Sequence, residues 1–282
     1  MRKILIPTDF SNNAYNAIVY ATKLFQNEPS TFYVLHSFEN EVSRLTSRVD
    51  IGKSEEVIDE LYDSTERKLE ELKKTISQNN LGSDHILETI ASSKRLSGMV
   101  NYLVKEKGID MVVMGTKGQT GAKEVLLGST TVQLIKKIEK SPLLVIPEDM
   151  EYTPLKHIAF ATGFEYPYTD TEVQPLLQLA AIDSATVHIL HMREDEQLEL
   201  DRKEHVSKLK TILETISYEI HWLTKGKSKT DVISDYVYSN PVDLLAMIYY
   251  KYGFLKSLFR ESIVKKVARH PGIPFLMIPA SK

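Results

Sequence analysis

The chain has 282 residues, enough for two domains of roughly 140 residues each, and its 42% hydrophobic and 26% charged residues are those of an ordinary globular protein. A net charge of −3 gives no electrostatic reason to expect a nucleic acid partner. The absence of cysteine excludes disulfides, cysteine-ligated zinc and cysteine nucleophiles.

The chain begins with MRKILIPTDF, a basic pair followed by a short apolar run. This run is too short for the core of a signal peptide. Nowhere does an apolar run approach the roughly 18 residues of a membrane helix. We therefore expect a cytoplasmic protein with no membrane partner.

The sequence of the first half predicts strands and helices in alternation. Short apolar runs predict strands at Ile4–Pro7, Phe32–His36, His85–Ile90, Met111–Met114 and Leu143–Ile146. Apolar residues at helical spacing predict one helix after the N-cap Ser11, one over Glu55–Gln78, one from Leu96 that stops at Gly108, and one over Thr130–Ile138. Such alternation is typical of a parallel sheet.

The second half repeats the first. Four segments recur in order: residues 3–11 match 157–165, 32–38 match 187–193, 109–115 match 242–248, and 141–147 match 273–279. The offsets are 154, 155, 133 and 132, so they stay nearly constant on each side of a shortened middle. We infer a tandem duplication with domains at 1–148 and 153–282. Each is expected to be an α/β domain, flavodoxin- or Rossmann-like, with a five-stranded parallel sheet of order 3-2-1-4-5 and helices on both faces.

Four glycines stand close together in VVMGTKGQTGAKEVLLGST, directly after the fourth predicted strand. The strand order reverses at this point, where such sheets bind ligands. Gly115, Gly118 and Gly128 let the backbone approach a ligand, and the helix that Gly128 opens offers amide groups and a dipole to phosphate. Ser129 and Thr130 add hydroxyl donors. The spacing matches neither the P-loop nor G-x-G-x-x-G, and the alternative is that these glycines only form turns and caps.

Asp9 leaves the first predicted strand at the same crevice. Its carboxylate could bond sugar hydroxyls or hold a metal ion that bridges phosphates. The eight histidines show no H-E-x-x-H or comparable spacing, which argues against a dedicated metal site. His36 and His191 recur at the end of the second strand in both halves, which favours a structural role for them.

The spacing G-x2-G-x9-G-[ST] after the fourth strand, with Pro7-Thr8-Asp9 after the first, resembles the ATP-binding branch of the universal stress protein (UspA-like) family, whose domains are adenine nucleotide alpha hydrolase-like. The resemblance implies ATP as the ligand, with or without Mg²⁺. It also implies that Asp9 meets the ribose, that the backbone at Ser37 contacts adenine, and that Pro7 and Met114 border the adenosine pocket, with Thr8 as a further contact. The phosphate cradle would consist of Gly115, Gly118, Gly128, Ser129 and Thr130.

The second half departs from this motif. The equivalents of Asp9, Gly115, Gly118 and Gly128 are Gly163, Ile248, Lys251 and Glu261, and Ser262 matches Ser129. A branched side chain and a negative charge oppose phosphate binding, so we expect no ATP in this half. Its loop is aromatic, with Tyr249, Tyr250, Tyr252, Phe254 and Phe259. These residues either fill the vacated pocket or an interface, or form a different ligand or partner site.

The fifth strand of each half, LLVI or FLMI, is an apolar edge that would promote aggregation if it stayed exposed. Pairing the two edges buries both, and domains of the family dimerise through this strand. We therefore expect an intramolecular pseudo-dimer, and further homodimer formation is left open.

The expected function is a regulatory or stress-response ATP binder rather than an efficient enzyme. Asp9 and Glu124 are the carboxylates near the phosphate motif, and no arginine lies beside it. Two alternatives stay open: a slow ATPase or other nucleotide-using enzyme, and a structural pseudo-dimer that binds a protein partner without nucleotide.

Overall fold

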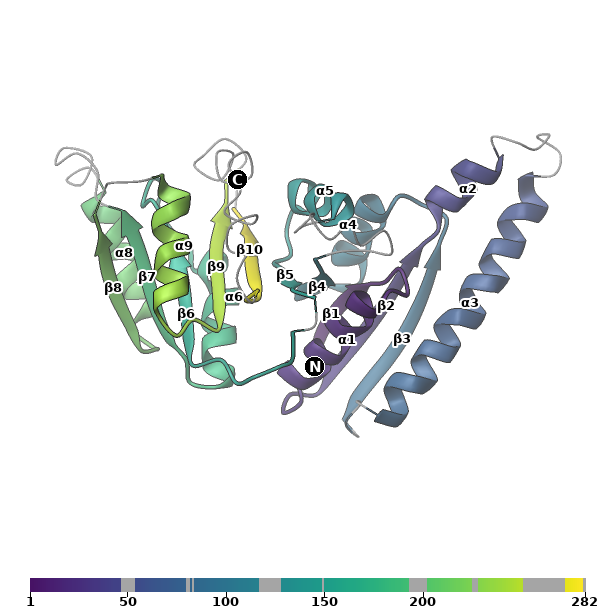
Figure 1. The fold of residues 1–282 in the computed structure, drawn as a ribbon, viewed down its shortest axis with the longest axis horizontal. Coiled ribbons are helices and arrows are strands. Elements are labelled where there is room, and N and C mark those ends of the chain that lie inside the picture. Colours follow the sequence, from purple (N-terminus) through teal and green to yellow (C-terminus); the bar gives the residue numbers. More distant parts are fainter. Residues whose placement is uncertain are drawn as a thin grey trace. The chain divides into compact units, whose positions relative to one another are not determined.

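The computed structural model describes residues 1–46, 54–79, 82, 84–116, 128–148, 150–192, 202–224, 228–250 and 272–280 (Figure 1). They form two compact units, one with the described residues up to 148 and the other with those from 150 onward. Within these ranges, none of the helices combines the length and the apolar character that a bilayer crossing requires.

The first unit is a five-stranded parallel sheet with helices on both faces (Figure 1). The strands follow the order β3-β2-β1-β4-β5 and are β1 (Arg2–Pro7), β2 (Ser30–Ser37), β3 (His85–Ser92), β4 (Met111–Gly115) and β5 (Leu143–Ile146). The helices are α1 (Asn12–Leu24), α2 (Glu39–Thr46), α3 (Ser54–Asn79), α4 (Leu96–Lys107) and α5 (Ser129–Lys137). The central strands are buried along most of their length, as a sheet covered on both faces requires.

The second unit has the same strand order, β8-β7-β6-β9-β10, again with parallel pairing. Its strands are β6 (His157–Ala161), β7 (Thr186–Met192), β8 (Tyr218–Leu223), β9 (Leu244–Tyr249) and β10 (Phe275–Pro279). Its helices are α6 (Asp170–Ile182), α8 (Lys203–Leu213) and α9 (Lys229–Ser239). The predicted α/β class and the strand order of both sheets are confirmed.

Strand register repeats between the two units with the offsets read from the sequence. In the first unit Ile4 pairs with Met111 and with Phe32, and in the second Ile158 pairs with Leu244 and with Val187. At the far edge, Gly115 pairs with Ile146 as Ile248 pairs with Ile278. Each of these pairs is related by the predicted offsets of 154, 155, 133 and 132. The two sheets are therefore equivalent residue by residue along these strands.

Two predicted helix ends are confirmed by their caps. Ser11 precedes α1, and its Oγ accepts a hydrogen bond from the Ala14 amide at 3.2 Å. Gly108 follows α4 with φ +65°, a left-handed conformation that glycine adopts without the steric cost of a Cβ. The sequence did not predict α2, because its eight residues, ENEVSRLT, carry only two apolar side chains.

A capping box at the start of α6 leads to a stability prediction. The Thr169 hydroxyl accepts from the Glu172 amide at 3.2 Å, and the buried Glu172 carboxylate accepts from the Thr169 amide at 3.1 Å. Thr169→Ala is expected to lower the free energy of unfolding of this unit by about 1 kcal/mol. Urea titration followed by fluorescence measures this, because the chain's one tryptophan, Trp222, lies in β8. Thr169→Ser keeps the hydroxyl and should leave the midpoint close to that of the parent chain.

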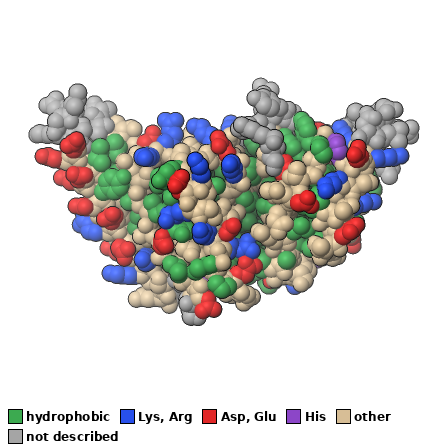
Figure 2. Space-filling model, turned by 180° about the vertical axis from the view of Figure 1, so that it is seen from behind, with side chains coloured by type: hydrophobic (Ala, Val, Ile, Leu, Met, Phe, Trp, Pro, Cys, Tyr) green, Lys and Arg blue, Asp and Glu red, His purple; other side chains and the backbone are tan. Residues whose placement is uncertain are grey.

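Figure 2 shows acidic and basic side chains interspersed over one face of the molecule, outside the grey atoms. Such mixing accompanies the net charge of −3. It provides no single-sign field on that face that would steer a highly charged partner.

Candidate functional site

The site is built where β1 and β4 part at the carboxyl end of the first sheet. The two strands pair at Ile4–Met111 and Leu5–Val112, and Pro7 and Met114 each lie two residues beyond the last pair. The chain then leaves β1 through Thr8 and Asp9 and leaves β4 at Gly115. The structure thus brings the predicted residues of the two strands to the point where the sheet order reverses.

The loop after β1 is fixed by its own backbone. The Thr8 amide donates to the Leu35 carbonyl at 2.8 Å, and the His36 Nδ1 lies 2.7 Å from the Thr8 carbonyl oxygen. Phe10 has φ +62°, which is rare for a bulky residue, and its amide donates to the Thr8 hydroxyl at 3.0 Å. Strained backbone of this kind persists where surrounding contacts hold it, often next to binding sites.

Asp9, just beyond the carboxyl end of β1, is held by the residue that caps α1. Its Oδ1 accepts from the Ser11 amide at 3.1 Å and from the Ser11 hydroxyl at 2.6 Å. The residue is half-buried, and an ionised carboxylate offers about four lone-pair positions. Asp9 therefore presents an oriented acceptor that suits a sugar hydroxyl or a cation.

Gly115 is required by packing as well as by the predicted ligand. A Cβ at this position would lie 2.6 Å from the Asn13 Oδ1 and 3.0 Å from the Asn13 carbonyl oxygen. Asn13 is buried in the first turn of α1, and its Nδ2 donates to the Thr116 hydroxyl at 3.2 Å. No sequence pattern predicts this contact, because Asn13 and Gly115 lie far apart along the chain.

The end of the glycine motif returns to the place where it began. The Gly128 amide donates to the Thr116 carbonyl at 2.7 Å, and the Thr131 hydroxyl donates to the carbonyls of Gly115 at 3.1 Å and Thr116 at 3.3 Å. These bonds hold the N-terminus of α5 beside the exit of β4. Ser129 and Thr130 are exposed in the first turn of α5, where amide groups and the helix dipole favour an anion.

Other predicted residues are placed only in part. Ser37 ends β2, is half-buried, and donates its hydroxyl to the Lys94 carbonyl at 2.7 Å. Gly118 lies outside the described residues, as does Glu124. The adenine contact expected for the Ser37 backbone stays a prediction.

The second unit repeats the loop but not the acidic and glycine positions. Phe164 has φ +53°, its amide donates to the Thr162 hydroxyl at 3.2 Å, and the His191 Nδ1 lies 3.0 Å from the Thr162 carbonyl oxygen. In both units the phenylalanine and histidine rings pack with centroids 4.6 Å apart. The occurrence of this arrangement in both units supports the structural role predicted for His36 and His191.

Bulky side chains surround the corresponding position of the second unit. The buried Ile248, together with Tyr166, Tyr168 and Tyr250, lines a cavity of only about 20 Å³. Tyr166 and Tyr250 stack with ring centroids 4.4 Å apart. Burial, followed by the nearby Glu172 carboxylate, raises the pKa of Tyr250 far above its ordinary value, so the phenol stays neutral. The described part of the aromatic loop thus packs into this position, while Tyr252, Phe254, Phe259, Lys251, Glu261 and Ser262 lie outside the described residues.

Fold and site together define a flavodoxin-like α/β protein of two repeated units, with a candidate ligand site at the reversal point of the first sheet. A family model described as the universal stress protein family matches residues 1–147. The chain therefore belongs to the universal stress protein family.

Individual relatives extend this match. The chain is 28% identical over 157 residues to universal stress protein MJ0577 of Methanocaldococcus jannaschii, a match that covers 51% of this chain and 94% of the relative. It is 24% identical over 294 residues to universal stress protein Slr1230 of Synechocystis, which covers 98% of this chain and 99% of the relative. A crystal structure of a universal stress protein from Archaeoglobus fulgidus has a TM-score of 0.68 at 18% identity, covers 99% of this chain and 97% of that chain, and shows the same fold.

Proposed function

We propose that the first unit binds ATP in the crevice between β1 and β4, and that the protein is a nucleotide-dependent regulatory or stress-response factor of the cytoplasm. One observation supports this most directly. The segment that carries the glycine motif leaves β4 at Gly115 and returns beside it, where the Gly128 amide bonds the Thr116 carbonyl at 2.7 Å. A helix N-terminus with two exposed hydroxyl residues is thereby fixed at the crevice mouth.

The chemistry of the residues present suits a nucleoside triphosphate. The N-terminus of α5 with Ser129 and Thr130 would hold phosphate oxygens, which carry the charge that such a terminus favours. The Asp9 carboxylate, oriented by Ser11, would accept from ribose hydroxyls or hold Mg²⁺ bound to the phosphates. Pro7 and Met114 would border the adenosine pocket, and Thr8 is fixed next to them by its bond to Leu35.

Binding without efficient turnover is the simpler expectation for this site. The Oδ1 of Asp9 already accepts two hydrogen bonds from Ser11, so this oxygen is engaged in positioning the loop rather than directed at an attacking water. Among the described residues of the proposed site there is no arginine that could donate hydrogen bonds to phosphate. Nucleotide occupancy would then act through the segment between Thr116 and Gly128, whose two ends lie at the site.

The proposal is tested by measuring binding and turnover on the same preparation. We expect ATP to bind with preference over GTP, binding to weaken about tenfold or more in Asp9→Asn, and no multiple turnovers with Mg²⁺ present. Asp84→Asn, an exposed carboxylate before β3, is the matched control and should leave the affinity unchanged. Multiple turnovers that Asp9→Asn abolishes would show that the protein is an enzyme instead.

Pairing of the two edge strands also stays a proposal. β5 and β10 are each the last strand of their own unit, and their side chains are apolar. Exposed apolar edges invite aggregation, so burying Leu143–Ile146 against Phe275–Pro279 would remove two liabilities at once.

A further inference from the structure

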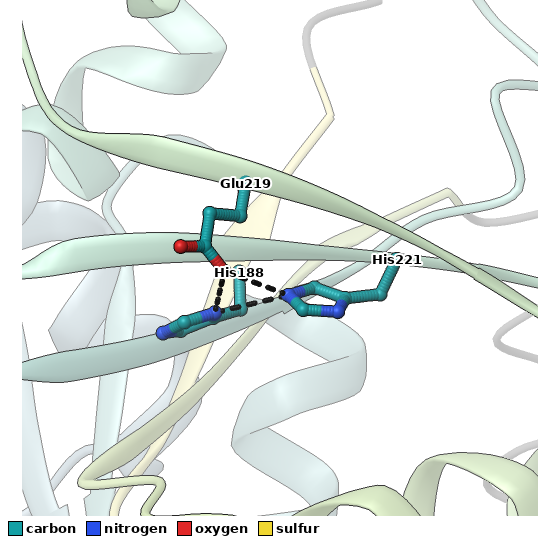
Figure 3. A group of neighbouring side chains, drawn as sticks. All are labelled: His188, Glu219 and His221. Atoms are coloured by element: carbon teal, nitrogen blue, oxygen red, sulfur yellow. Dashed lines mark hydrogen bonds and ion pairs between the residues drawn. The ribbon is translucent and has the colours of Figure 1, made fainter.

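Two histidines and a glutamate converge on one face of the second sheet. His188 of β7 pairs in register with Glu219 of β8, and His221 follows Glu219 by two residues, so the three side chains share a face. Figure 3 shows them pointing toward one another, and each offers one ligand atom within 4.8 Å of the other two. None of these residues takes part in the site proposed for ATP.

The three ligand atoms form a triangle of the size that a metal ion requires. His188 Nδ1 lies 3.1 Å from His221 Nε2, and the Glu219 Oε2 lies 3.5 Å from each of these nitrogens (Figure 3). Zinc bonds of about 2.0–2.2 Å at tetrahedral angles separate neighbouring ligand atoms by about 3.3 Å. The spacing of the three atoms therefore suits an ion about 2 Å from each of them.

We propose that His188, Glu219 and His221 bind a divalent transition metal ion, for which Zn²⁺ is the best match. Two imidazoles and a carboxylate are a ligand set that zinc uses with water as the fourth ligand. Imidazole nitrogen also disfavours Mg²⁺ and Ca²⁺, which prefer oxygen ligands. The Glu219 side chain is 62% exposed and the His221 side chain 30%, so an ion and its water can reach the site from solvent.

Neighbouring groups hold His188 in the form that binds a metal. Its Nε2 lies 3.1 Å from the His157 Nδ1, so with Nδ1 on the ion the Nε2 hydrogen has an acceptor. Such outer partners fix the tautomer and orientation of metal-bound histidine. The His221 ring is packed against Tyr236 of α9, with centroids 5.1 Å apart.

The first unit provides an internal control, because the same positions there carry different side chains. Tyr33 pairs with Glu88 and Leu35 with Ile90, in the places where the second unit has His188 with Glu219 and Leu190 with His221. Glu88 is thus the equivalent carboxylate without histidines, and it lies 3.7 Å from the Lys107 ammonium. The cluster is a property of the second unit and not of the repeated fold.

The test is zinc binding by the full chain after EDTA treatment, in the absence of nucleotide. Calorimetric titration with ZnCl₂ should show one zinc ion per chain. The affinity should fall at least about 100-fold in His188→Gln and His221→Gln and about 10-fold to 100-fold in His157→Gln, which removes the outer partner. Glu219→Gln alters an exposed side chain, is expected to fold normally, and should weaken binding about 10-fold or more. The matched variant Glu88→Gln should bind zinc like the parent chain.

Cobalt(II) provides a second readout that a loosely associated ion would not produce. Co²⁺ in a site with two imidazoles should give visible absorption bands that Glu219→Gln shifts and His221→Gln abolishes. Failure of the parent chain to bind zinc would overturn the proposal. Equal weakening by Glu88→Gln and Glu219→Gln would also overturn it, because binding would then not depend on this cluster.

Discussion

Replacing Gly128 with glutamate is expected to lower the affinity of the chain for ATP by at least about 100-fold. Glutamate is the residue that the second unit carries at the equivalent position, Glu261. Its charge would lie at the N-terminus of α5, where the proposed site holds phosphate. Like charges brought together in a binding site cost several kcal/mol, and about 1.4 kcal/mol corresponds to a factor of ten in affinity.

This change separates binding from folding. Gly128 has φ −61° and ψ 151°, a conformation open to any residue, so glutamate causes no backbone strain. A negative charge at a helix N-terminus is favourable by about 0.3–1 kcal/mol, so the melting temperature without nucleotide should stay level or rise. Gly128→Gln is the matched neutral control and should lose much less affinity. Unchanged ATP binding in Gly128→Glu would show that phosphate does not lie at this helix end.

Gly115→Ala is expected to lower the free energy of unfolding by about 1–3 kcal/mol even when no nucleotide is present. The added Cβ would meet the Asn13 Oδ1 at 2.6 Å and the Asn13 carbonyl oxygen at 3.0 Å. The side chain of Asn13 is buried, and the carbonyl belongs to the first turn of α1, so relief requires α1 to move from β4. Denaturation followed by far-ultraviolet circular dichroism measures the loss.

A second glycine makes the comparison decisive. Gly98 lies inside α4, and a Cβ there would meet no atom within 4 Å. Gly98→Ala should therefore raise the free energy of unfolding by about 0.5–1 kcal/mol, since alanine is the better helix former. The double variant Asn13→Ala with Gly115→Ala should recover part of the loss, because it removes the closer of the two overlaps. Equal effects of Gly98→Ala and Gly115→Ala would contradict the role given to Asn13.

The strands and their register could be predicted because each depends on local apolar pattern and on an internal repeat. The offset between Ile4 and Ile158 was readable from sequence, and their pairing with Met111 and Leu244 confirms it. Helix ends were predictable where one residue decides them, as Ser11 does through its bond to Ala14 and Gly108 through its positive φ. These features need no knowledge of distant contacts.

The remaining features depend on contacts between residues far apart in the chain. The glycine motif explains Gly115 by ligand binding alone. In the structure, the need for glycine at this position comes partly from contact with Asn13. The positive φ of Phe10 has no sequence signal, because phenylalanine does not favour that conformation. The histidine cluster has no sequence motif because its ligands come from two adjacent strands, and the pairing of His188 with Glu219 depends on the register of those strands.

The central claim is that nucleotide binds in the first unit alone, and the number of ATP molecules bound per chain tests it most directly. Calorimetric titration of ATP into the full chain should give one site, and the same titration into Gly128→Glu should give none at the same concentrations. Two equivalent sites, or one site that persists undiminished in Gly128→Glu, would contradict the claim.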